Sequence, residues 1–154
     1  MTLLLFLILV ATALNRMLAG ASLEGSLVKL PARRRIGNVA YATFARGNDL
    51  GNGRVVYPIW AISATVLIFL ATVVSWVTTQ PLGLFLPLLL ASGTSVCHFL
   101  ATSQTAPTML SLKNTPDDEA ILAAKLDRFE RWHAVRATFQ VLTFFLMLWA
   151  LVVA

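Results

Sequence analysis

The sequence predicts an all-α integral membrane protein, a bundle of four transmembrane helices, from three observations. Of its 154 residues, 58% are hydrophobic and 12% are charged, against roughly 45–50% and about 25% in soluble domains. From Val55 to Leu112 there is no Asp, Glu, Lys or Arg, a length that requires two spans. The basic residues gather in two of the three connections between hydrophobic runs. We therefore expect a single four-helix membrane domain over residues 1–154.

Each span follows from its apolar run. The run at residues 3–14 is too short for a bilayer core of about 30 Å, so the first span is expected at about residues 2–23 and includes Arg16. A short turn with Pro and Gly separates the second span, about residues 59–77, from the third, about residues 84–105. The fourth is expected at about residues 133–153, continuing a helix that begins in the polar segment before it.

The N-terminal run invites comparison with a signal peptide. It has no Lys or Arg before its apolar residues, and we expect it to be retained as the first span. The alanine-rich stretch at residues 11–21 leaves cleavage open as an alternative.

The connection between the first two spans is basic. Pro31 is expected to end the first helix, and Arg33, Arg34 and Arg35 then precede apolar residues at helical spacing. Two interpretations are open for this segment: an amphipathic helix in the membrane interface, or a solvated basic loop. The GNDLGNG run at residues 47–53 is expected to be a turn cluster. It lacks the acidic ligands of a calcium loop and the Lys-Ser/Thr of a phosphate loop, so neither metal nor nucleotide binding is expected there.

Charge placement also predicts topology. Four spans put the first and third connections on one side, and both are basic, whereas the second has no charge. The positive-inside rule then places both connections in the cytoplasm and both termini outside it. Because the basic residues lie in connections without interleaved aromatics, the lipid bilayer is the expected partner and nucleic acid is not.

A polar layer is expected where three spans meet. His133, Arg136 and Gln140 share one helix face, and polar groups in a membrane are costly unless they are partnered. At 1.5 Å per residue, Arg16 and His98 lie roughly 6–8 Å from the midplane on the cytoplasmic side, Gln140 roughly 5 Å and Arg136 roughly 10 Å. His133, at about 15 Å, is expected at the interface outside this layer. Whether Arg16 faces the bundle or snorkels to the surface is open.

Three stretches of the sequence resemble a known family. LPARRRIG, RGNDLGNG followed shortly by YP, and FERWHAVRA before the last hydrophobic run are similar to bacterial members of the four-span family that includes fungal anthrone oxygenases. The resemblance covers most of the chain. It implies a bacterial inner-membrane location and oxidation of a phenolic or quinone-like substrate without metal or organic cofactor. It also implies roles for Trp132, His133, Arg136 and Asn114.

Two classes of function follow. As an enzyme, the protein would use His98 or His133 as general base, Arg16 and Arg136 as stabilisers of an enolate, and Gln140, Trp132 and Asn114 in binding. As a non-catalytic protein, it would be an accessory subunit of a larger membrane complex, a homo-oligomer, or a lipid or quinone binder, with a structural polar layer. Haem ligation by the two histidines is a further alternative.

Overall fold

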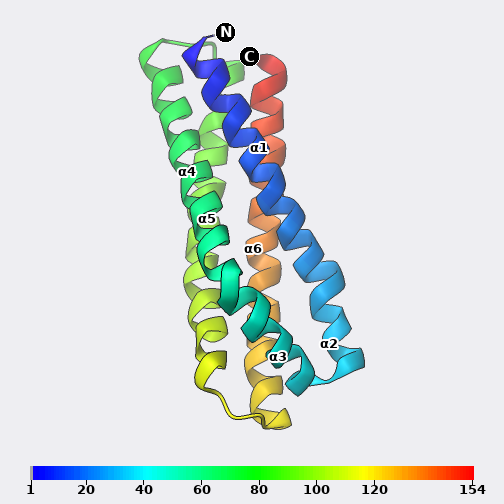
Figure 1. Ribbon diagram of the computed structural model, residues 1–154. Coiled ribbons are helices and arrows are strands. Elements are labelled where there is room, and N and C mark those ends of the chain that lie inside the picture. The colour runs from blue at the N-terminus through cyan, green and yellow to red at the C-terminus, as the bar shows by residue number, and fades with distance from the viewer. Residues whose placement is uncertain (1) are drawn as a thin grey trace.

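The computed structural model describes residues 2–154, and within that range the chain is almost entirely helical (Figure 1). Four long helices follow one another over these residues, 34, 40, 33 and 35 residues in length, the second with a kink at Gly51, and each is apolar enough to cross a membrane. In chain order their elements are α1 (Leu3–Glu24), the π-helical η1 (Gly25–Lys29) and α2 (Leu30–Ile36); α3 (Asn38–Gly47), the π-helical η2 (Asn48–Asn52) and α4 (Gly53–Val77); α5 (Leu82–Ser111) and the 3₁₀ turn η3 (Leu112–Asn114); and α6 (Glu119–Val153).

Local sequence explains where the long helices begin and end. The Thr2 hydroxyl accepts a hydrogen bond from the Leu5 N–H, and the Asp118 carboxylate accepts one from the Ile121 N–H, so both α1 and α6 have N-caps. Gly37 separates α2 from α3 with φ of +85°, a conformation that favours glycine. The predicted spans at 59–77, 84–105 and 133–153 each fall inside one long helix, and the first begins one residue before its helix.

The bundle is divided into an apolar half and a charged half. A helix of 34 residues is about 51 Å long, whereas the hydrocarbon core of a bilayer is about 30 Å thick. Apart from Arg16, the charged residues all lie in residues 24–54 and 113–136, at the end of the bundle opposite the two termini (Figure 1). The molecule is therefore a four-span membrane protein whose helices continue past the apolar half.

Each half has its own core. The core of the apolar half contains one fully buried side chain from each of the four long helices, namely Ile8, Ile68, Leu88 and Met147. In the charged half, the core brings α2 and α3 against the end of α5 and the start of α6; it contains Leu30, Tyr41, Ala42, Ala45, Met109, Leu112, Leu122, Leu126 and Phe129.

Ion pairs tie α2 to α6. Arg33, 7% exposed, donates from Nη2 to Asp127 at 2.5 Å and to Glu130 at 3.1 Å. Charged hydrogen bonds of this kind are stronger than neutral ones. They hold α2 against α6.

The structure bears on three expectations for the first connection. Pro31 does not end the first helix, because it lies in the first turn of α2 directly after the π segment, where the α-helical hydrogen-bond ladder is already interrupted and a missing N–H costs little. The GNDLGNG run, expected as a turn cluster, is the short segment η2 with its flanking glycines; its backbone is helical except at Gly51, where non-helical angles kink the chain between α3 and α4. The basic segment is helical, but the inner face of α3 is buried by Tyr41, Ala42 and Ala45 against protein rather than lipid.

Candidate functional site

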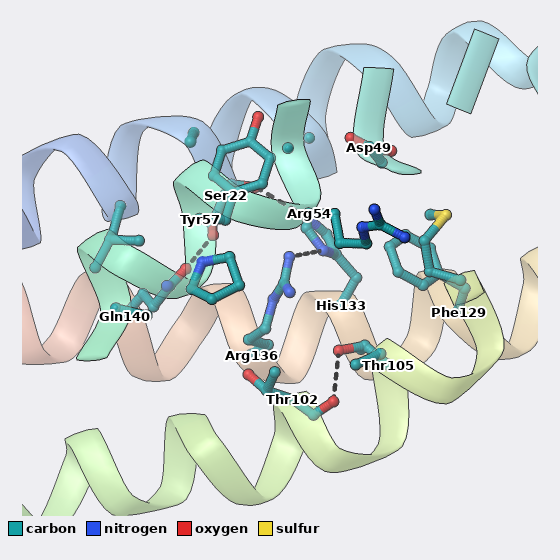
Figure 2. A pocket seen from close by; sticks show the side chains of 18 of the residues that line it. Ser22, Asp49, Arg54, Tyr57, Thr102, Thr105, Phe129, His133, Arg136 and Gln140 are labelled. Carbon is teal, nitrogen blue, oxygen red and sulfur yellow. Dashed lines mark hydrogen bonds between the residues drawn. The ribbon is translucent and has the colours of Figure 1, made fainter. Parts of the chain in front are cut away.

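A cavity of about 300 Å³ lies where the apolar and charged halves meet. Side chains from all four long helices line it, and Figure 2 shows Arg136 between the Gln140 end and the end that carries Asp49 and Arg54. Most of the wall is apolar. Its polar and charged lining residues are Ser22, Lys29, Tyr41, Asp49, Arg54, Tyr57, His98, Thr102, Thr105, His133, Arg136 and Gln140.

Arg136 and His133 form one hydrogen-bonded unit on α6. The Arg136 Nη2 donates to the His133 Nδ1 at 2.7 Å. Because a guanidinium has donors only, Nδ1 must be the accepting nitrogen, and Nε2 carries the proton. That Nε2–H donates across the cavity wall to the Ser22 carbonyl oxygen at 3.3 Å. Both ring nitrogens of His133 are thus engaged, and the ring holds the end of α1 against α6 (Figure 2).

A second chain joins three helices beside the first. The Ser22 hydroxyl donates to the Gln140 Oε1, and the Gln140 Nε2 donates to the His98 Nε2 at 3.4 Å. With its Nε2 accepting, His98 carries its proton on Nδ1. This Nδ1 is buried and has no hydrogen-bond partner among residues 2–154. A buried donor without a partner is costly, so a ligand atom that accepted from it would stabilise the site.

The charge of Arg136 has no close counterion. Its Nε is buried without a partner, and within the described part of the chain no carboxylate lies within 4.0 Å of it. The wall carries three cationic side chains, Lys29, Arg54 and Arg136, against one carboxylate, Asp49, and of the three cations Lys29 is paired with Glu24 at 3.1 Å. An uncompensated cation in a low-dielectric wall strongly attracts a negative group. The cavity therefore suits an anionic or partly anionic ligand.

The π-helical η1 and the kinked segment η2 both border this cavity. Gly25 and Lys29 of η1 line it, as do Asp49 and Leu50 of η2. π-Helical turns are rare and are often found at functional sites. At Gly25 the reason for glycine is visible: a Cβ there would lie 2.7 Å from the His133 Nε2. The close approach of η1 is what allows His133 to reach the Ser22 carbonyl.

Four of the seven candidate residues predicted from sequence come together at this cavity. His98, Arg136 and Gln140 line it as the depth comparison implied. His133, expected at the depth of the interface and outside the layer, is only 5% exposed and lines the same cavity. The long helices carry the protein core past the apolar half, so a residue expected at the interface is enclosed by α1 and η1.

The other three candidates lie elsewhere. Arg16 is exposed on the outer face of α1 and is absent from the cavity wall; its neighbour Asn15 is the buried one and donates to the Ala11 carbonyl at 2.8 Å. Trp132 is 38% exposed, and Asn114 is exposed in η3. An α-helix turns about 100° per residue, so adjacent positions such as Trp132 and His133 face different surroundings.

Sequence reasoning missed several lining residues. Ser22 and Gly25 had a usable signal, since small residues at helical spacing mark close helix contacts in membranes. Asp49 and Tyr57 lie in the RGNDLGNG tract and the YP pair, which supported the family resemblance but were given no place in the site.

Among residues 2–154, no group of three or more His, Cys, Asp or Glu residues is arranged to hold a metal ion. The Nε2 atoms of His98 and His133, which axial haem ligation commonly uses, make protein hydrogen bonds. Haem ligation stays a prediction.

Compared with known proteins, the chain matches no protein-family model, no curated protein and no solved structure. The resemblance to the anthrone oxygenase family therefore stays a prediction. The class that the fold defines is a four-span, all-α membrane bundle with an internal cavity at the junction of its two halves.

Proposed function

We propose that this protein binds a lipophilic, phenol-like or quinone-like molecule in the cavity, with an ionisable oxygen of that molecule beside Arg136. The observation that supports this most is the guanidinium without a counterion in a mostly apolar wall. A charge in such a place is expensive unless paired, and the ligand supplies the pair. The His98 Nδ1–H offers the same oxygen, or a second one, a hydrogen bond.

The reaction that fits this placement is cofactor-independent oxidation, as in the family that the sequence resembles. His98 would remove a proton from an activated CH₂ group, and Arg136 would stabilise the enolate oxygen. O₂ would then add to the carbanion carbon. Loss of water leaves one oxygen atom as a new carbonyl, so CH₂ and O₂ give C=O and H₂O. His98 can serve as base when the Gln140 amide turns over, since Nε2 then donates and Nδ1 accepts.

A second candidate is binding without chemistry, as a lipid or quinone carrier or an accessory subunit. One observation favours it: both ring nitrogens of His133 are engaged within the protein, so His133 is a positioning residue rather than a free base. The candidate also accommodates a homo-oligomer or a larger membrane complex, with the cavity as a structural ligand site.

Binding is tested with Arg136→Gln and with Arg131→Gln as its control, because Arg131 is exposed on the same helix. The probe is a hydroxynaphthoquinone, whose acidic hydroxyl is ionised at neutral pH and whose absorbance reports its environment. We expect Arg136→Gln to weaken binding at least about tenfold, a change of about 1.4 kcal/mol, and the control to bind as the parent does. Equal binding by Arg136→Gln would reject the proposal.

Catalysis is tested by O₂ consumption with anthrone as the substrate. We expect His98→Ala to lower the rate at least about a hundredfold, in line with the loss of a general base. Full turnover by a His98→Ala, His133→Ala double variant would end the catalytic version. Probe binding without any anthrone oxidation by the parent protein would support the carrier instead.

The proposal includes a location: a bacterial inner membrane, with both termini outside the cytoplasm and the charged half of the bundle on the cytoplasmic side. It is supported by the basic connections at one end of the bundle and the charge-free connection at the other.

A further inference from the structure

The seam between α4 and α5 is closed by hydrogen bonds in the apolar half. The hydroxyls of Thr65 and Ser95 are 2.7 Å apart, and those of Thr72 and Ser92 are 2.9 Å apart. Thr72 also donates to the Leu88 carbonyl at 3.2 Å. Hydroxyls that bond across helices hold membrane helices in close contact.

Beyond Thr65 and Ser95, toward the charged half, the described residues of α4 and α5 are no longer joined by such hydrogen bonds. In the described part of the chain, no side-chain hydrogen bond or ion pair joins residues 53–64 of α4 to residues 98–111 of α5. The first turns of α4 follow the kink at Gly51 and contain Pro58, both of which bend helices. Figure 1 shows this part of α4 turning away from α5 and toward α3. The two helices therefore diverge beside the cavity.

Apolar residues on this diverging seam face two ways. Ile62 is 54% exposed and Phe99 is 36% exposed, yet both also line the cavity. On a membrane-spanning helix, an exposed apolar side chain meets lipid. A side chain that borders both the lipid face and the cavity marks an opening between them.

We propose that the ligand reaches the cavity sideways from the bilayer, through the α4–α5 seam below Thr65 and Ser95, and that it is an amphiphile whose apolar chain stays in this seam. The inference rests on the proposed function and specifies its ligand class. The polar ring lies at Arg136 and His98, and the chain passes between Ile62 and Phe99 into lipid.

The size and polarity of the cavity support an amphiphile with a compact head. A volume of about 300 Å³ is at the small end for ligand sites, enough for a ring system without a long chain. The other end of the cavity is lined by Lys29, Asp49 and Arg54, which an apolar chain could pass only by desolvating charges. The α4–α5 seam is the apolar exit.

The test uses a hydroxynaphthoquinone that bears an undecyl chain with a photoreactive diazirine on the part of the chain next to the ring. The protein is reconstituted in liposomes and irradiated, and labelled residues are located by mass spectrometry with and without excess unlabelled compound. We expect competed adducts on α4 and α5 around Ile62 and Phe99. Competed adducts around Lys29 and Arg54, or adducts on all lipid-facing helices that the competitor leaves unchanged, would overturn the lateral route.

A second measurement blocks the seam. In a Cys97→Ser background, Ile62→Cys and Phe99→Cys are bridged with a dithiol-reactive crosslinker, and exchange of the chain-bearing probe is followed by its absorbance. We expect the bridge to slow exchange at least about tenfold, a barrier of about 1.4 kcal/mol. The control bridges Thr65→Cys and Ser95→Cys, which are already in contact, and should leave exchange unchanged. Equal exchange rates with both bridges would contradict the route.

The chain-free hydroxynaphthoquinone separates the two proposals. If it binds and Arg136→Gln weakens it, while the chain labels another surface, the lateral route is wrong and the proposed function stands. If neither probe binds, the proposed function fails and the route fails with it.

Discussion

The Nη2 of Arg136 donates to the Nδ1 of His133 at 2.7 Å, three residues earlier on α6. This one bond sets the tautomer of the imidazole, turns its Nε2–H toward the Ser22 carbonyl, and anchors the guanidinium in the cavity wall. Arg136 therefore meets a ligand with its position already determined, which lowers the entropic cost of binding.

Gly25→Ala tests the packing that allows this arrangement. A Cβ at residue 25 would meet the His133 Nε2 at 2.7 Å, so the ring must move and its bond to Ser22 must break. We expect a loss of about 1–3 kcal/mol in unfolding free energy, as for other overpacked sites, together with weaker probe binding. The measurements are thermal unfolding in detergent and probe titration.

Gly20→Ala is the matched control on the same long helix. A Cβ there meets nothing within 4 Å, and alanine favours helix over glycine by roughly 0.5–1 kcal/mol. We expect unchanged binding and equal or slightly higher stability. If the two variants behaved alike, the contact between Gly25 and His133 would have no importance.

Gln140→Leu tests the chain that joins Ser22 and His98. Leucine has a similar volume but leaves the Ser22 hydroxyl and the His98 Nε2 without their Gln140 partner. We expect destabilisation of about 1 kcal/mol, the scale measured for hydrogen bonds between membrane helices, measured by thermal unfolding. Gln80→Leu, in the turn before α5, is the control, and a Gln140→Leu protein as stable as this control would count against the chain.

Arg33→Gln tests the ion pairs between α2 and α6. Arg33 is buried and donates to both Asp127 and Glu130, so its loss should cost about 1–3 kcal/mol, the range for hydrogen bonds to charged groups. The exposed Arg35 gives the control Arg35→Gln, for which we expect a change below about 0.5 kcal/mol. Unfolding is measured by chemical denaturation at low and at high salt. We expect high salt to narrow the stability difference between the two variants, and a difference that grew with salt would contradict an ionic origin.

Topology is tested by thiol labelling in a Cys97→Ser background. Leu82→Cys lies beside the charge-free connection and is 71% exposed, whereas Asn114→Cys lies in the third, basic connection. We expect an impermeant maleimide added to intact cells to label the first and to label the second only after permeabilisation. The reverse pattern would invert the proposed orientation.

The sequence was informative about how far along its helix each polar side chain lies, and uninformative about which way that side chain points. Counting residues along each span predicted a common level for His98, Arg136 and Gln140, because the rise per residue of a helix is nearly constant, and all three residues line one cavity. The same count included Arg16, which faces outward. The direction of a side chain depends on the rotation of its helix about its own axis, and only packing against the neighbouring helices sets that rotation.

The sequence by itself determined the class of the molecule: four apolar helices, basic connections at one end, and polar residues where charge and apolarity meet. Composition and periodicity suffice for this because the cost of leaving apolar surface in water or charge in lipid is nearly independent of neighbours. The tertiary structure decided which residues form the site. It placed Ser22, Gly25 and Asp49 in the wall of the same cavity as Arg136, because the continuation of α1 through Pro31, the π-helical η1 and the kinked η2 bring distant parts of the chain together. Those contacts depend on the shape of every helix at once, and no local pattern contains them.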